Sequence, residues 1–269
     1  MHASMVRTLL VRGMLAGLVA GLFAFAAAYL GGEPSVNRSI AVEEAQAARE
    51  TAHSEHGDHG GAGAGAVEEE EVVGRSAQST FGLATGVLVY GVALGGVAAL
   101  AFSFALGRVG RFGPRATAAL TAAAAFTTVC LVPFLKYPAT PPAVGNPDTI
   151  GRRTALFFLM ILLSVLLGTA AVIAGRRLAP RLGNWNASLA AGLGFVAVTG
   201  AAFVVLPSND DAVSATFPAD LLWEFRMASL GVQAVLWTVF AIVFGVLAQK
   251  ALAARTGGTE APARTGIAG

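Results

Sequence analysis

The sequence predicts an all-α integral membrane protein, a polytopic helical bundle of about six transmembrane helices. Of its 269 residues 55% are hydrophobic and 13% are charged, whereas soluble domains carry about 25% charged residues. Apolar runs of about 20 residues recur along the chain, and each is long enough to cross about 30 Å of hydrocarbon as a helix. Backbone polar groups in lipid must be paired within their own segment, and the runs are too long for barrel strands. Helical spans therefore follow.

The six predicted spans cover about residues 8–30, 81–106, 116–136, 154–174, 186–206 and 226–248. The first combines a basic start, an apolar core and small residues, which is also the pattern of a cleaved signal peptide. A retained helix is favoured, because the run is longer than a usual signal core and Gly13, Gly17 and Gly21 line one helical face. Cleavage would leave five spans. The one cysteine, Cys130, lies within the third run, where a packing role is expected.

Positive charge predicts the orientation of the bundle, because short cytoplasmic loops are enriched in lysine and arginine. With both termini inside, the inner segments hold eleven basic residues and one acidic residue, Glu260. The outer segments hold the other seven basic residues and fifteen acidic residues. The eleven inner basic residues are Arg7, Arg12, Arg108, Arg111, Arg115, Arg176, Arg177, Arg181, Lys250, Arg255 and Arg264. The excess favours six spans with cytoplasmic N- and C-termini.

Four parts follow from this reading of the chain. Residues 1–30 are the first transmembrane helix, and residues 31–79 are an extracytoplasmic, flexible loop rich in histidine and glutamate. Residues 80–249 form a five-helix membrane bundle, and residues 250–269 are a disordered cytoplasmic tail. The loop has little apolar content and is long for a connection, so we expect disorder without a ligand, apart from a short surface helix at residues 39–50.

Three of the four histidines stand in "HSEHGDHGG", residues 53–61, with two carboxylates between them. Neutral imidazole binds cobalt, nickel, copper and zinc well, and carboxylates add negative charge. The candidate metal ligands are His53, Glu55, His56, Asp58 and His59. The alternative is a solvated polar linker without a ligand. A flexible site of this kind would collect ions rather than catalyse a reaction, because nothing holds a metal with a vacant coordination position facing a substrate.

A second group of charged residues is expected at the outer ends of spans three and four. Lys136 ends one span, and Asp148, Arg152 and Arg153 open the next. Two arginines at an outer helix N-terminus oppose both the helix dipole and the positive-inside rule. The alternatives are a local ion-paired cap, in which Asp148 meets Arg152, and a gating or partner-contact cluster that includes Arg226.

Acidic residues before the last span could form a mouth for a cation. Asp220 and Glu224 are four residues apart and share a helix face, and Asp210 and Asp211 lie just upstream. With Asp148 they are the candidate ion mouth, since charged groups near the membrane usually face cavities or partners. The alternative is an ordinary interfacial belt. The spans themselves contain no acidic residue and no histidine, which argues against a buried proton relay in this chain alone.

Catalytic motifs are absent, so an enzyme is not expected. The sequence contains no G-x-x-x-x-G-K-[ST] phosphate loop, no H-E-x-x-H and no G-x-S-x-G. The isoelectric point near 9.0 reflects arginines at the membrane surface and does not indicate nucleic acid. No tightly bound cofactor is expected.

Several stretches together resemble the CbtA family of probable cobalt transporter subunits. They are "MVRTLLVRGMLAGLVAGLFAF", "GVLVYGVALGG", "LVPFLKYP", "PPAVGNPDTIGRRTALFF" and "FPADLLWEFRMASLGVQ". The resemblance implies a bacterial plasma-membrane subunit for cobalt uptake that works beside a small single-span partner, CbtB, with histidines of its own.

The combined hypothesis is a subunit of a divalent metal uptake transporter whose outer loop collects the ion. Cobalt is the expected metal, with nickel and zinc as alternatives. The expected partners are the lipid bilayer and a CbtB-like protein, and an oligomer is left open. The rival hypothesis is a scaffold or metal-sensing accessory protein that does not itself transport and serves a partner transporter.

Overall fold

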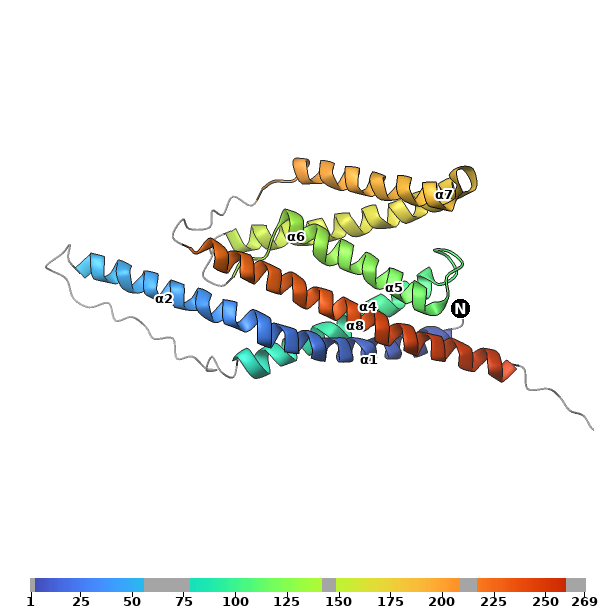
Figure 1. Cartoon of the computed structure of the whole chain (residues 1–269), viewed down its shortest axis with the longest axis horizontal. Helices are drawn as coiled ribbons and strands as arrows, with labels where there is room; N and C mark the ends of the chain where they lie inside the picture. Colours follow the sequence, from blue (N-terminus) through green and yellow to red (C-terminus); the bar gives the residue numbers. More distant parts are fainter. Residues whose placement is uncertain (1–2, 56–77, 142–148, 209–216, 260–269) are drawn as a thin grey trace, which may run out of the picture. The chain divides into compact units, whose positions relative to one another are not determined.

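The computed structural model describes residues 3–55, 78–141, 149–208 and 217–259, and in these ranges the regular structure is helical, without strands. The contacts divide the chain into two compact units. Unit 1 comprises Met1–Phe23, Leu88–Ala125 and Val235–Gly269, and unit 2 comprises Ala24–Val87 and Phe126–Ala234. The helical elements, labelled in Figure 1 where there is room, are α1 (Ala3–Ala27), η1 (Ala28–Gly32), α2 (Glu33–Glu55), η2 (Gln78–Gly82), α4 (Leu83–Ala105), α5 (Pro114–Ala125), η3 (Phe126–Leu131), α6 (Val132–Lys136), α7 (Ile150–Val205) and α8 (Ala219–Thr259).

Five helices in the described part of the chain are long and apolar enough to cross a membrane. They are Ala3–Arg49, Thr80–Ala105, Pro114–Lys136, Ile150–Val205 and Ala219–Ala254. Each of the six predicted spans coincides with part of one of them to within one residue, and the fourth and fifth predicted spans both correspond to Ile150–Val205. The all-α membrane fold predicted from composition is confirmed.

The long helix α7 is a hairpin of two arms and not one straight rod. Gly183 has φ 76° and ψ 160° inside it, a left-handed conformation that favours glycine and breaks the helix. Figure 1 shows α7 folding back at this point. A Cβ added at Gly175 would lie 3.2 Å from the Cβ of Ala191, so the two arms approach closely near the turn. The second arm, residues 184–205, is about 33 Å long at 1.5 Å per residue, which suits one crossing.

In unit 1, α1 and α4 meet through glycine. A Cβ added at Gly17 would lie 2.1 Å from the carbonyl oxygen of Gly91, and one added at Gly95 would lie 2.4 Å from that of Gly13. A Cβ added at Gly91 would lie 3.2 Å from the Cα of Gly21. The backbones therefore touch, as the spacing of glycines 13, 17 and 21 predicts, because small residues let helices in lipid approach closely.

Helix α8 completes unit 1 with a row of aromatic residues. Phe240 and Phe244 stack with ring centroids 5.1 Å apart, and Phe244 meets Phe102 of α4 edge to face at 5.0 Å. Trp237 meets Phe240 edge to face at 6.0 Å. These rings are buried, and such pairs contribute about 0.5–1.5 kcal/mol beyond their burial. They give α8 a defined register against α4.

Unit 2 packs the α7 hairpin against η3 and α6. Its buried core contains Val132, Tyr137 and Met160, with Phe195 and Phe203 of the second arm packed against it. The π-helical segment η3 interrupts the third span, and the Ser164 hydroxyl of α7 donates a hydrogen bond to the carbonyl oxygen of Thr128 within it. A π-helical turn changes the register of the backbone hydrogen bonds, and a neighbouring hydroxyl can satisfy a carbonyl there.

Helix α2 is longer than the helix predicted at residues 39–50. It begins at Glu33, directly after η1, and ends at Glu55. Alanine, glutamate and glutamine are strong helix formers and are concentrated at residues 41–50, and the N-terminal extension of α2 continues the helix that begins at Ala3. In the remainder of the segment predicted to be a flexible loop, residues 56–77 lie outside the described residues, and Gln78 and Ser79 belong to η2.

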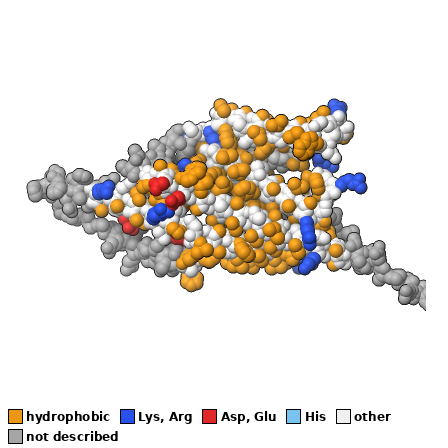
Figure 2. All heavy atoms as spheres, viewed as in Figure 1, with side chains coloured by type: hydrophobic (Ala, Val, Ile, Leu, Met, Phe, Trp, Pro, Cys, Tyr) orange, Lys and Arg blue, Asp and Glu red, His pale blue; other side chains and the backbone are white. Residues whose placement is uncertain are grey.

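The surface of the described helices is strongly apolar, as Figure 2 shows for one face. Leu30 is 76% exposed, Phe81 75%, Trp185 76%, Val204 86% and Val205 83%. In water such a surface would be an aggregation hazard, whereas lipid tails are as apolar as leucine. The protein is therefore a membrane protein whose helices face the bilayer.

Candidate functional site

Lys136 holds the end of the α7 hairpin to α6. Its ammonium group donates a hydrogen bond of 2.7 Å to the carbonyl oxygen of Phe203, in the last turn of α7. In a continuing helix that carbonyl would accept from the N–H group of residue 207, but this residue is Pro207, which has none. The lysine supplies the missing donor. Its predicted role in gating or partner contact stays a prediction, and its position in the structure is that of a helix cap.

Tyr137 makes a second tie between the same segments. Its hydroxyl donates a hydrogen bond of 2.7 Å to the carbonyl oxygen of Pro207. Tyr137 directly follows the third span, and burial raises its pKa above the ordinary value, while the positive charge of Arg152 opposes that shift. The hydroxyl therefore stays protonated at physiological pH and remains a donor. Arg152 itself is exposed, and Arg153 is half-buried in the first turn of α7.

The beginning of α8 is tied to two other parts of unit 2. The Arg226 guanidinium donates a hydrogen bond of 3.3 Å to the carbonyl oxygen of Ala139, just after α6. Glu224 forms an ion pair with Arg38 of α2. The side chains of Arg38 and Glu224 are 54% and 48% exposed, so the pair is well solvated. The Glu224 carboxylate, a candidate for the ion mouth, thus already has a cationic partner.

Asp220 differs from Glu224 although it lies one turn earlier on the same helix. It is exposed, and it has no hydrogen-bond or ion-pair partner among the described residues. Of the five predicted mouth residues, Asp148, Asp210 and Asp211 lie outside the described residues. Asp220 is therefore the described acidic side chain of this group that has no partner among the described residues, and its role at an ion mouth stays a prediction.

The predicted metal ligands fall at the end of the described part of α2 and beyond it. His53 and Glu55 belong to the last turn of α2, and His56, Asp58 and His59 lie outside the described residues. Within the described ranges, no three His, Cys, Asp or Glu side chains are grouped so that they could hold a metal ion. The arrangement of the five ligands stays a prediction.

Cys130 lies inside the membrane part of unit 2. It is buried in η3, and its thiol donates a hydrogen bond of 3.6 Å to the side-chain oxygen of Gln233 on α8. The pair joins two helices through polar groups, which is a common way for transmembrane helices to associate. The contact agrees with the packing role expected for this cysteine.

A family model described as "Probable cobalt transporter subunit (CbtA)" matches residues 6–249 of the chain. The chain belongs to the CbtA family. No curated protein and no solved structure matches the sequence. The match includes all or most of each of the five candidate membrane-spanning helices in the described residues. It also includes the Lys136, Arg152, Glu224 and Arg226 positions, so the resemblance expected from the sequence is confirmed.

Membership in the CbtA family has three consequences at this level of detail. The description implies cobalt as the transported ion, and the word subunit implies that the chain works within a complex. The description as a transporter subunit favours a non-enzymatic role. The apolar helices place this complex in a lipid bilayer.

Sequence reasoning missed Arg38 as a functional candidate. It stands in a polar segment beside other charged residues, and its partner Glu224 is 186 positions away. No spacing rule connects residues so far apart. The excess of acidic residues in the outer segments was the available signal, since a basic residue among them is expected to find a carboxylate.

Proposed function

We propose that this CbtA-family chain is a cobalt uptake subunit of the bacterial plasma membrane whose outer segment collects the metal. The observation that carries the proposal is the family match across residues 6–249, which covers all or most of each candidate membrane-spanning helix in the described residues. The collecting segment contains His53, Glu55, His56, Asp58 and His59. The proposed orientation places it outside and both termini in the cytoplasm.

The path of the ion from this segment to the membrane begins at the acidic end of α8. Asp220 is exposed and lacks a partner among the described residues, so its carboxylate can accept a cation. Glu224 is held by Arg38, and a cation that approaches would compete with that ion pair. Asp148, Asp210 and Asp211 supply further negative charge in the neighbouring segments of the sequence. The CbtB-like partner would supply ligands that this chain lacks within its spans.

The experiment is uptake of radiolabelled cobalt by cells that express the chain with its partner. Replacing His53, His56 and His59 together by alanine should slow uptake several-fold at scarce cobalt and leave it nearly normal at abundant cobalt, because a collecting site raises only the local concentration. The loss should resemble that seen in the parent below about pH 6, since protonated imidazole does not bind metal. Asp220→Asn should instead lower uptake at every cobalt concentration.

Two controls separate the proposal from its rival. Glu260→Gln, in the proposed cytoplasmic tail, changes one carboxylate to an amide as Asp220→Asn does and should leave uptake unchanged. Expression of each of the two proteins without the other tests the rival hypothesis, in which this chain is a scaffold or metal-sensing accessory. A partner that takes up cobalt equally well without this chain would refute the uptake role. A triple alanine variant that equals the parent at the lowest cobalt concentration would reduce the histidine segment to a linker.

A further inference from the structure

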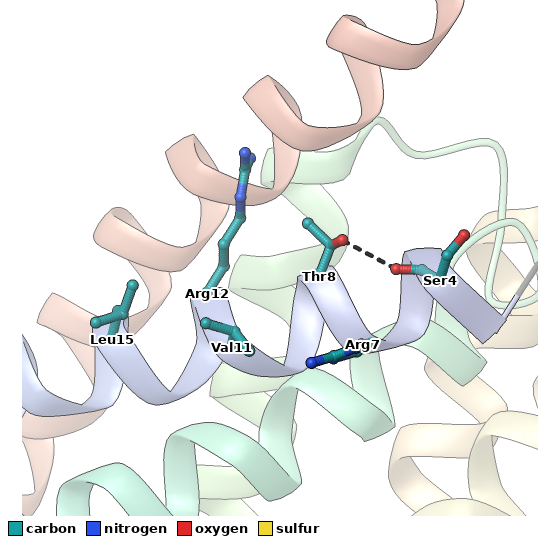
Figure 3. A pocket seen from close by; sticks show the side chains of 6 residues that line it. All are labelled: Ser4, Arg7, Thr8, Val11, Arg12 and Leu15. Atoms are coloured by element: carbon teal, nitrogen blue, oxygen red, sulfur yellow. Dashed lines mark hydrogen bonds between the residues drawn. The ribbon is translucent and has the colours of Figure 1, made fainter.

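The first helix bears a pocket that the proposed transport function does not use. Its volume is about 580 Å³, and Figure 3 shows its lining, which consists of Ser4, Arg7, Thr8, Val11, Arg12 and Leu15. All six residues belong to α1, in unit 1. The pocket thus follows the helix from its first turn into the membrane-spanning part.

The pocket lining combines two cationic side chains, Arg7 and Arg12, with the apolar side chains of Val11 and Leu15. In Figure 3 the Arg12 side chain extends away from α1 and the Arg7 side chain lies along it. Arg12 donates a hydrogen bond to the carbonyl oxygen of Leu247, which holds its guanidinium in place and leaves further N–H donors on the same group. Val11 is 49% exposed and Leu15 53% exposed, so hydrocarbon surface adjoins the two cations.

The charge around the pocket is one-sided. Unit 1 contains eight basic residues, and its one acidic residue is Glu260, outside the described ranges. Arg7 is exposed and has no ion-pair or hydrogen-bond partner among the described residues. Nothing within the described part of unit 1 neutralises these guanidinium groups. An anion from outside the chain is the fitting counter-charge.

We propose that this pocket binds the phosphodiester headgroup of an anionic phospholipid. Guanidinium groups bind phosphate oxygens through paired, charge-assisted hydrogen bonds, and basic pockets at the membrane surface hold anionic headgroups. The exposed Val11 and Leu15 favour a lipid over free phosphate, because acyl chains can cover them and an inorganic ion cannot. The lipid would fix the depth of α1 in the membrane, and the glycine face of α1 packs against α4. This inference does not depend on cobalt transport.

The test uses the full chain purified in detergent and native mass spectrometry with three added probes. These are phosphatidylglycerol, phosphatidylcholine of the same acyl chains, and inorganic phosphate. The parent should retain phosphatidylglycerol in preference to the other two. Arg7→Gln should weaken that binding about fivefold, since one basic residue near an anionic surface contributes about that factor. Arg111→Gln, an equal charge change in the exposed loop between α4 and α5, should leave it unchanged.

The design separates loss of binding from loss of folding. Arg7 is exposed and has no hydrogen-bond or ion-pair partner among the described residues, so Arg7→Gln should keep the parent's gel-filtration profile. Arg12→Lys keeps the charge and removes the planar fork, and it should weaken phosphatidylglycerol binding while retaining some preference over phosphatidylcholine. Equal retention of phosphatidylcholine, or equal weakening by Arg111→Gln, would overturn the site. Inorganic phosphate that displaces the lipid at similar concentration would show a free-anion site instead, and would overturn the lipid assignment.

Discussion

Single residues at the ends of helices decide how the α7 hairpin is held. Pro207 has no backbone N–H group to donate to the carbonyl oxygen of Phe203. The Lys136 ammonium group donates a hydrogen bond of 2.7 Å to this oxygen instead. The hydroxyl of the adjacent Tyr137 donates a hydrogen bond to the carbonyl oxygen of Pro207, just beyond the end of α7. Two consecutive side chains, Lys136 at the end of the third span and Tyr137 directly after it, therefore position the end of the fifth.

Lys136→Met should destabilise the protein by about 1.5–3 kcal/mol, the usual range for a hydrogen bond that involves a charged group. The methionine keeps the aliphatic volume and leaves the Phe203 carbonyl without a donor. Thermal unfolding in detergent measures the effect. Lys250→Met is the matched control, because Lys250 is exposed in α8 and has no hydrogen-bond or ion-pair partner among the described residues. Equal melting temperatures for the two variants would argue against the cap.

The sequence could indicate these charged residues but not their partners. A lysine and two arginines on the outer side of spans three and four are visible exceptions to the positive-inside rule. The Lys136 ammonium finds a carbonyl 67 positions away, and Arg226 finds one 87 positions away. Such contacts depend on how the helices pack, which local spacing does not encode.

At the scale of the helices, the spans themselves were the readily predicted part. Hydropathy and length define them, because only a helix satisfies its backbone in lipid. The sequence also predicts a turn between residues 174 and 186, because basic residues separate two apolar runs there, and the structure places the break at Gly183. The π-helical segments were not predicted, since η3 reads as an ordinary apolar stretch, "FTTVCL", and its hydrogen-bond register is set by neighbours such as Ser164.

The glycine face of α1 makes a prediction about helix pairing. Gly17→Leu should sharply reduce the folded protein recovered from membranes, because a Cβ at this position would lie 2.1 Å from the Gly91 carbonyl oxygen. Overpacking costs about 1–3 kcal/mol when neighbours can move, and here the neighbour is backbone. The control is Gly86→Leu in α4, where an added Cβ meets nothing within 4 Å. Fluorescence-detected gel filtration compares the two, and equal recovery would contradict the contact.

The whole molecule is organised by an asymmetry of charge. Eleven basic residues and one acidic residue occupy the segments assigned to the inside, against seven basic and fifteen acidic residues outside. The structure adds that the sixth crossing arises from the second arm of α7, so both termini lie on one side when each arm crosses once. An even number of crossings places both termini on the same side of the membrane, as the charge pattern predicts.

We predict that residues 40–75 are outside the membrane and that residues 107–115, 176–183 and 250–269 are inside. The excess of basic residues in the three inner segments is the physical reason, because lysine and arginine near short loops resist translocation. Single cysteines at Ser54 and Gly113 test this in a Cys130→Ala background. Gly113 suits the purpose since an added Cβ meets nothing within 4 Å there. In intact cells an impermeant thiol reagent should label Ser54→Cys and should reach Gly113→Cys only after permeabilisation. Equal labelling of both in intact cells would contradict the six-crossing arrangement, and labelling of Gly113→Cys alone would invert it.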